Sequence, residues 1–191
     1  MRKSLLVIIV LSPMIFVACS RPEYPMKFVS TDKHEFDAYK EKCSGRPSPP
    51  ERTSANFGET NVFITYSQPA VREREIWNGL VKFNQIWRTG ANEATVFSSN
   101  GKLLVNGDTL LAGNYAMYTI PTKDKWTLIF NKKYDVWGAY DYDKSLDALR
   151  ISIDPTTIEE HSERMTFVID ETGTVRFNWE KLTFDFVVLP I

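Results

Sequence analysis

The sequence predicts an all-β fold, a single antiparallel β-sandwich of the jelly-roll kind, over residues 58–191. The main observation is that apolar and polar residues alternate with a period of two, which is typical of strands that bury one face. Turn residues separate these runs at the spacing of sandwiches and barrels, so we expect about nine short strands. The alternation is clearest in five segments: KWTLIF, LRISI, RMTFVID, TVRFNWE and LTFDFVV.

The alternation also predicts the core, because the apolar positions of each strand fall on one face. Turns are marked as well: Asn106-Gly107 is a strong hairpin signal, and Asn100-Gly101 and Glu171-Thr172-Gly173 are further turn candidates. One stretch, IWNGLVKFNQIW at 76–87, does not alternate and predicts a loop with a helical turn before the segment WRTGAN. The residues we expect in the core include Phe167, Ile169, Phe177, Trp179, Phe184 and Phe186.

The N-terminus has the layout of an export signal. Arg2 and Lys3 precede an apolar run, 5–18, that is too short to span a bilayer as a helix. The run ends Phe16-Val17-Ala18-Cys19, which resembles a bacterial lipobox with phenylalanine in place of the usual leucine. We therefore expect a signal peptide at 1–18 and lipidation, including palmitate, at Cys19. The alternative is an ordinary secretory signal with an incidental cysteine.

We predict that residues 19–57 form a lipidated polar tether, because the segment is polar and rich in proline. The segment HEFDAYKEK, 34–42, could form a short helix that docks on the domain, since it is too short to stand alone. Lipidation of Cys19 would leave Cys43 as the only free thiol, which we interpret as a spare thiol in the tether. The fold would then depend on burial instead of disulfides.

Charge argues against nucleic acid as a partner. The chain has 23 basic and 24 acidic residues, and two of the basic ones lie in the predicted signal. Basic residues do not gather in a block, as a phosphate-binding surface would require.

The segment WRTGANEAT, 87–95, is the strongest candidate for a binding site. The functional interpretation is a rim on which Trp87 is a platform and Arg88, Asn92 and Glu93 make polar contacts. The structural interpretation, which we favour, is that a mostly buried Arg88 pins the turn through carbonyls or a carboxylate. We also expect this turn to lie beside the loop 66–74.

Two further residues, Arg74 and Tyr140, are weaker candidates for the same rim. Aromatic and polar side chains together suit a glycan or another polar small molecule, although they suit a sandwich core equally well. We expect no cofactor.

Catalytic and metal motifs are weak. Asp141, Asp143, Ser145 and Asp147 are spaced as in a calcium loop, but the essential glycine and final glutamate are missing, so we predict no metal site. His34 and His161 lack metal-ligand spacing. An enzyme remains an alternative, namely a glycan hydrolase that pairs Glu93 with Glu73 or Asp141, but no catalytic residue can be assigned.

The segments YSQPAVREREIWNGL, WRTGANEAT, LLAGNYAMYTIP, WTLIFN and WGAYDY follow one another in an order that resembles domain-of-unknown-function family 2911. The resemblance runs from about Ser48 to Ile191. It implies a β-rich exported bacterial protein, often lipid-anchored, and no established activity. Gln68 and Glu73 depart from the arginine and glycine usual in that family.

Together these observations predict an envelope lipoprotein on the periplasmic or surface face of a bacterial membrane. Its expected partners are the membrane, through the lipid anchor, and a glycan or small polar ligand. We expect a binding or interaction module, with the hydrolase as the alternative.

Overall fold

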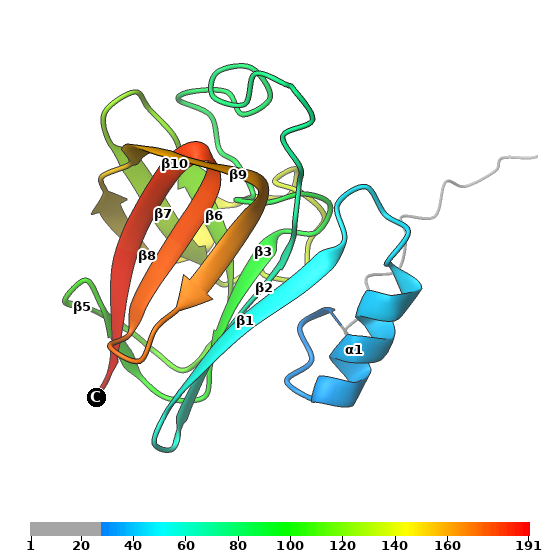
Figure 1. The fold of residues 1–191 in the computed structure, drawn as a ribbon. Helices are drawn as coiled ribbons and strands as arrows, with labels where there is room; N and C mark the ends of the chain where they lie inside the picture. The colour runs from blue at the N-terminus through cyan, green and yellow to red at the C-terminus, as the bar shows by residue number, and fades with distance from the viewer. Residues whose placement is uncertain (1–27) are drawn as a thin grey trace, which may run out of the picture.

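The structure, a computed structural model, describes residues 28–191 and consists of two antiparallel sheets packed face to face (Figure 1). This architecture confirms the predicted all-β sandwich. The first sheet has the order β1-β2-β3-β6-β7-β8. Its strands are β1 (Pro50–Phe57), β2 (Thr60–Ser67), β3 (Thr95–Ser99), β6 (Gly113–Ile120), β7 (Trp126–Asn131) and β8 (Asp147–Ile153).

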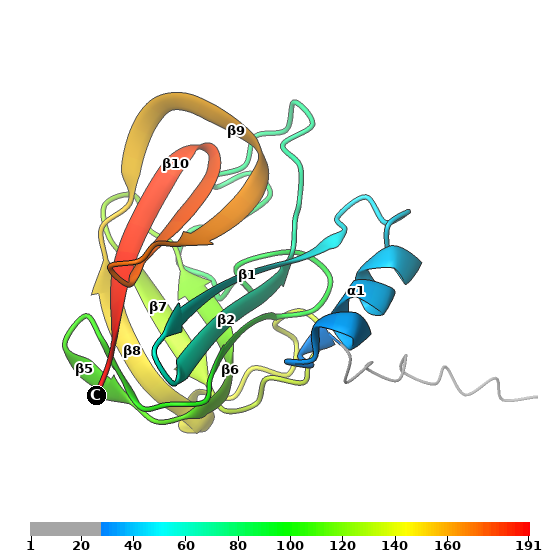
Figure 2. The ribbon, with the colours of Figure 1, turned by 60° about the horizontal axis from the view of Figure 1, so that its bottom comes forward.

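The second sheet has the order β5-β4-β10-β9. Its strands are β4 (Leu103–Val105), β5 (Asp108–Leu110), β9 (Thr156–Ile169) and β10 (Thr174–Pro190). The main chain of β10 reverses near Glu180, which has a positive φ of 57°. Its two limbs lie side by side (Figure 2), and the amide of Val188 donates to the carbonyl of Gly173 at 2.8 Å.

The core lies between the two sheets, and all six core residues predicted from the alternation are buried. Phe177 and Phe184, from the two limbs of β10, stack with ring centroids 4.6 Å apart. Burying side chains of this size contributes roughly 1.5 to 3 kcal/mol each, so this interface is the main source of stability.

The predicted hairpin at Asn106-Gly107 is confirmed. Val105 of β4 pairs with Asp108 of β5, which leaves two residues in the turn. Both turn residues have positive φ, 48° and 93°, as a tight turn between twisted strands requires. The stretch 76–87 is a loop, as predicted, but it contains turns and no helix.

The predicted domain boundary at Gly58 is wrong in one respect. Residues 50–57, which we assigned to the tether, form β1, and Pro50 pairs with Ser67 at the start of an eight-residue register with β2. The sandwich therefore begins at Pro50. The predicted signal peptide and the predicted lipidation site, Cys19, lie outside the described residues.

The helix α1 (Lys33–Lys42) docks against the outer face of the first sheet beside β1 and β2 (Figures 1 and 2). Asp32 caps it, because its side chain accepts a hydrogen bond from the amide of Glu35. Phe28, Tyr39 and Cys43 pack with Val96 of β3 in a small apolar cluster. Cys43 is consequently buried and part of the fold, not a spare thiol in a tether.

A second cover on this outer face comes from the segment 132–146, which includes the 3₁₀ helix η2 (Lys144–Leu146). Val136 packs there with Tyr118 and Ile129 of the sheet. Asp143 caps η2 by accepting from the amide of Ser145 at 2.9 Å. No helix among residues 28–191 is long and apolar enough to cross a membrane.

Candidate functional site

The turn 87–95 sits where the first sheet ends, beside Ser67 at the end of β2. Trp87 and Thr119 exchange two main-chain hydrogen bonds of 2.8 and 2.9 Å, which fixes the start of the turn on β6. The amide of Ala91 donates to the carbonyl of Ser67 at 3.3 Å. The expected contact between this turn and the loop 66–74 is therefore confirmed at Ser67.

Glycine is required at position 90. A Cβ on Gly90 would lie 2.8 Å from the hydroxyl oxygen of Thr95 and 3.4 Å from the carbonyl oxygen of Ser67. This close approach explains the glycine that the sequence places between Thr89 and Ala91.

Trp87 belongs to the aromatic core. Its ring stacks on Trp179 with centroids 5.8 Å apart and meets Trp77 edge-on at 6.2 Å. Its indole N–H donates to the carbonyl of Gly90 at 3.1 Å. The half-buried ring therefore closes the end of the sandwich, and its role as a platform for a ligand stays a prediction.

Glu93 is the buried charge of this turn, with 2% of its surface exposed. The hydroxyl of Tyr39 donates to Oε1 at 2.5 Å, Arg46 Nη1 lies 2.7 Å from the same oxygen, and the hydroxyl of Ser67 donates to Oε2 at 3.0 Å. The prediction that Glu93 faces solvent in a cleft is wrong, because donors from three segments enclose its carboxylate.

These contacts shift the pKa values of two of the donors, Tyr39 and Arg46. Burial, followed by the hydrogen bond to Glu93, raises the pKa of Tyr39 well above its ordinary value. Burial by itself lowers the pKa of Arg46, but the hydrogen bond and the negative charge of Glu93 outweigh it and raise the pKa. Tyr39 therefore stays neutral and Arg46 stays charged, as the buried carboxylate requires.

Asn92 is half-buried and forms hydrogen bonds with the main chain of two other segments. Its side chain donates to the carbonyl of Ser48 at 2.9 Å, and its own carbonyl accepts from the amide of Gly138 at 3.0 Å. Its positive φ of 56° is one that asparagine tolerates well. We expected Asn92 to face a cleft; its contacts instead join the turn to the segments before β1 and after β7.

Arg88 and Tyr140 meet around Gly138. A Cβ on Gly138 would lie 3.0 Å from the Tyr140 ring and 3.3 Å from Arg88 Nη1. Arg88 is half-buried, whereas Tyr140 is 85% exposed. These two predicted residues are brought together where the turn 87–95 meets the segment 132–146.

Arg74 is not part of this group. Its guanidinium donates to the carbonyls of Val71 and Ala70 in its own loop, which is in turn bonded to Glu163 of β9. Five of the six predicted residues thus lie in or beside the turn. The hydrolase alternative pairs Glu93 with Glu73 or Asp141. Glu93 is enclosed, Glu73 is exposed in the loop 66–74, and Asp141 is half-buried in the segment 132–146.

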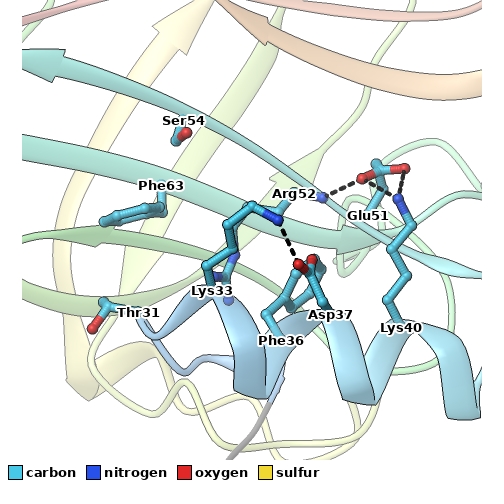
Figure 3. Close-up of a pocket in the computed structure, with 9 residues that line it drawn as sticks. All are labelled: Thr31, Lys33, Phe36, Asp37, Lys40, Glu51, Arg52, Ser54 and Phe63. Atoms are coloured by element: carbon cyan, nitrogen blue, oxygen red, sulfur yellow. Dashed lines mark hydrogen bonds and ion pairs between the residues drawn. The ribbon is translucent and has the colours of Figure 1, made fainter.

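A hollow of about 250 Å³ lies elsewhere, between α1 and the strands β1 and β2 (Figure 3). Arg52 of β1 lines it, and the sequence did not reveal this residue because it lies in the segment assigned to the tether. Its guanidinium carbon lies 3.9 Å from the centroid of the Phe36 ring and 5.6 Å from that of Phe63. The lining residues are Thr31, Lys33, Phe36, Asp37, Lys40, Glu51, Arg52, Ser54 and Phe63.

Neutral groups hold Arg52 in place. Nε donates to the hydroxyl of Thr65 at 3.0 Å, and Nη2 donates to the carbonyls of Ser30 at 2.5 Å and Phe28 at 3.4 Å. Within residues 28–191, the Nη1 atom of Arg52 forms no hydrogen bond. Burial lowers the pKa of Arg52 to about 10, while the negative charge of Asp37 opposes this shift, so the group stays charged at neutral pH. Arg52 forms no direct ion pair with a carboxylate within residues 28–191.

The other charges of the hollow are already paired. Lys33 Nζ lies 2.5 Å from Asp37 Oδ2, and Lys40 Nζ lies 2.6 Å from Glu51 Oε2 (Figure 3). Three cations, Lys33, Lys40 and Arg52, against two carboxylates leave the hollow with one excess positive charge. The hollow can therefore attract an anionic group.

A protein-family model matches residues 48–188. The chain belongs to that family, which is described as Protein of unknown function (DUF2911). This confirms the resemblance seen in the sequence. No curated protein and no solved structure matches the chain.

The DUF2911 match includes only some of the residues that line the hollow. Arg52, Ser54 and Phe63 lie inside the matched residues, whereas Phe36 and the rest of α1 precede them. The sheet side of the hollow is thus part of the DUF2911 domain, and α1, which covers it, precedes the matched residues.

The remaining motifs do not form sites within residues 28–191. Asp143 of the calcium-like segment caps η2, and Asp147 accepts from Asn131 at 2.7 Å and from the hydroxyl of Tyr142 at 2.8 Å. His34 and His161 are exposed. No group of three or more His, Cys, Asp or Glu side chains in this range could hold a metal ion.

Proposed function

We propose that this DUF2911 protein is a lipid-anchored envelope module that binds a small polar molecule carrying a carboxylate, phosphate or similar anionic group. The observation that carries the proposal is Arg52, a half-buried guanidinium that lines a hollow and forms no direct ion pair with a carboxylate among residues 28–191. A cation placed in this way favours an anion, because the interaction is screened less than at an exposed surface.

The hollow combines charge with groups that can orient a ligand. The rings of Phe36 and Phe63 offer apolar contact, and the hydroxyls of Thr31 and Ser54 can donate or accept. Its volume of about 250 Å³ is just below the usual range for pockets that hold drug-sized ligands. The ligand is therefore a small acid or phosphorylated compound, not a long polymer.

The anchor is supported by the sequence layout described above, with Cys19 as the lipidated residue. Nine positions separate Cys19 from Phe28, the first described residue. A fully extended chain of that length spans about 30 Å. Because the carbonyls of Phe28 and Ser30 bind Arg52 directly, the hollow would lie close to the membrane surface.

Thermal unfolding in the presence of small anions tests the proposal. Acetate, malate, phosphate and sugar phosphates, each compared with an uncharged analogue at constant ionic strength, form the panel. A ligand that binds only the native state raises stability by about 2.7 kcal/mol at one hundred times its Kd. We expect at least one anion, and none of the neutral analogues, to raise the melting temperature.

A larger side chain that fills the hollow tests whether the anion binds there. Ser54→Phe places a ring in it at an exposed position of β1, and should remove the shift without unfolding the protein. Ser44→Phe is the matched control, since Ser44 is exposed and outside the hollow. The proposal is wrong if no anion gives a shift, or if the shift survives Ser54→Phe.

A further inference from the structure

Strand β9 wraps around the reversal of β10 (Figure 2). Its first residues pair with the second limb, as Thr157 does with Leu182. Ser162 then pairs with Glu180 at the reversal, and Ile169 pairs with Val175 on the first limb. Register shifts on both sides of Glu180 allow this curvature, as bulges commonly do.

The curved strand and the outer face of β10 enclose a hollow of about 430 Å³, which we call the β9 cup. Its wall carries Ile158, Glu160 and Ser162 from β9. Its floor carries Arg176, Asn178, Thr183 and Asp185 from the two limbs of β10.

The charges of the β9 cup differ from those of the Arg52 hollow. Arg176 and Asp185 form a two-pronged ion pair, with Nε to Oδ1 at 2.9 Å and Nη2 to Oδ2 at 2.6 Å. Glu160 makes no ion pair with any described residue, so the cup has one excess negative charge. An anionic ligand is disfavoured here.

The cup also offers several hydrogen-bonding groups that make no side-chain bond within residues 28–191. They include the amide of Asn178, the hydroxyl of Ser162 and the carboxylate of Glu160. An amide and a hydroxyl donate as well as accept, whereas a carboxylate only accepts. Hydroxyl groups of a ligand match this mixture, because each of them can donate one bond and accept others. Ile158 supplies an apolar contact for carbon-bound hydrogens.

A second, smaller hollow of about 240 Å³ continues from the cup and shares Thr183 and Asp185 with it. It adds the hydroxyls of Ser152 and Thr156 and the carboxylate of Asp154. The two hollows together form a polar path from the outer face of the second sheet to the end of β8 in the first.

We infer that the β9 cup is a binding site for a neutral sugar, and that the adjoining hollow accepts a further unit of a short glycan. The site is independent of Arg52, since it lies on the other sheet and favours the opposite ligand charge. Glu160 accepts from hydroxyls of the sugar, Asn178 donates and accepts, and Ile158 packs against the ring.

Titration of the isotope-labelled protein with sugars, followed by amide NMR, tests the inference. The probes are cellotriose, maltotriose and chitotriose, with glucose as a single unit and trigalacturonate as an anionic counterpart. At least one neutral trisaccharide should move the signals of Asn178 and Thr183 at millimolar concentration, and bind more tightly than the single unit. Trigalacturonate should bind more weakly at these residues.

Two matched variants locate the site. Glu160→Gln removes the excess charge and one acceptor position, so it should weaken binding roughly tenfold, the effect of one hydrogen bond of ordinary strength. Glu159→Gln makes the same change at the neighbouring exposed residue, which does not line the cup, and should leave binding unchanged.

The inference is overturned if no neutral sugar moves these signals, if trigalacturonate binds there as tightly, or if the two variants behave alike. None of these outcomes depends on an anion binding at Arg52. Failure of this inference and failure of the proposed function are therefore distinguishable.

Discussion

Arg46 Nη1 lies 2.7 Å from Glu93 Oε1, although 47 residues separate them in the sequence. Arg46 follows α1, and Glu93 belongs to the turn that ends the first sheet. The pair therefore fastens the helical segment to the sandwich. Tyr39, which bonds to the same carboxylate oxygen, adds a second contact from α1 itself.

This relationship gives Glu93 a structural role that we had not expected, and it predicts the outcome of replacing Glu93 and Arg88 by alanine. Glu93→Ala removes a carboxylate that three side chains enclose and should cost about 3 kcal/mol, the lower end for a buried pair because Arg46 is one third exposed. Arg88→Ala should cost less. Chemical denaturation of the two variants measures the difference, and a larger loss for Arg88→Ala would contradict this assignment.

The strands with a clear period-two pattern could be predicted because each buries one face in the core. Alternation is a local signal, and it identified Phe167, Phe177 and Phe184 correctly. Strand β1 was not predicted, because it is an edge strand with few apolar residues and follows several prolines. Its sequence is PERTSANF. Only Ala55 and Phe57 pack on the core there, too few for a period-two pattern.

The surroundings of Glu93 could not be predicted, because its partners come from distant parts of the chain. Nothing in WRTGANEAT indicates that Tyr39 and Arg46 will cover it. A charged residue beside glycine and asparagine is usually exposed, and we assigned it that way. The Arg52 hollow is equally non-local, since Phe36 and Phe63 come from a helix and a neighbouring strand.

The fold predicts a large effect for Phe177→Ala. The Phe177 ring is fully buried and lies 4.6 Å from Phe184 and 5.3 Å from Phe167, measured between centroids. Its removal leaves a cavity between the sheets and should lower the free energy of unfolding by roughly 3 to 5 kcal/mol. Val168→Ala, at a neighbouring position that is 52% exposed, is the control and should change it by no more than about 0.5 kcal/mol.

Two buried tyrosines should respond differently to loss of their hydroxyl groups. The hydroxyl of Tyr66 accepts from the amide of Phe167 at 3.1 Å, whereas that of Tyr118 is buried and bonds to no described group. Tyr66→Phe should therefore cost about 1 kcal/mol or more, since it leaves a buried amide unpaired. Tyr118→Phe should leave the free energy of unfolding unchanged or raise it. Denaturant midpoints compare the two, and a clear loss in Tyr118→Phe would indicate that its hydroxyl has a partner.

The anchor is tested by Cys19→Ala in the full-length chain. Lipidated cysteine would hold the protein to membrane, because more than one acyl chain binds far more firmly than a single chain. Cys19→Ala should appear in the soluble fraction or remain unprocessed, whereas Cys43→Ala, which alters the buried cysteine, should stay with the membrane. Fractionation and mass spectrometry of the N-terminus provide the measurement. Membrane association of Cys19→Ala as firm as that of the parent would rule out the anchor.

Alkaline pH should weaken the fold through Tyr66. Burial raises the pKa of Tyr66 from its ordinary value of 10.0 to about 12. Below pH 10 the phenol is neutral in both states, so its contribution is fully present. Between pH 10 and pH 12 the unfolded chain loses this proton while the folded chain keeps it, and stability falls with rising pH by about 3 kcal/mol in total. Urea denaturation across this range should show the decline in the free energy of unfolding. Relative to its own lower stability at pH 8, Tyr66→Phe should show a shallower decline. An equal slope in the two proteins would assign the alkaline loss to other tyrosines.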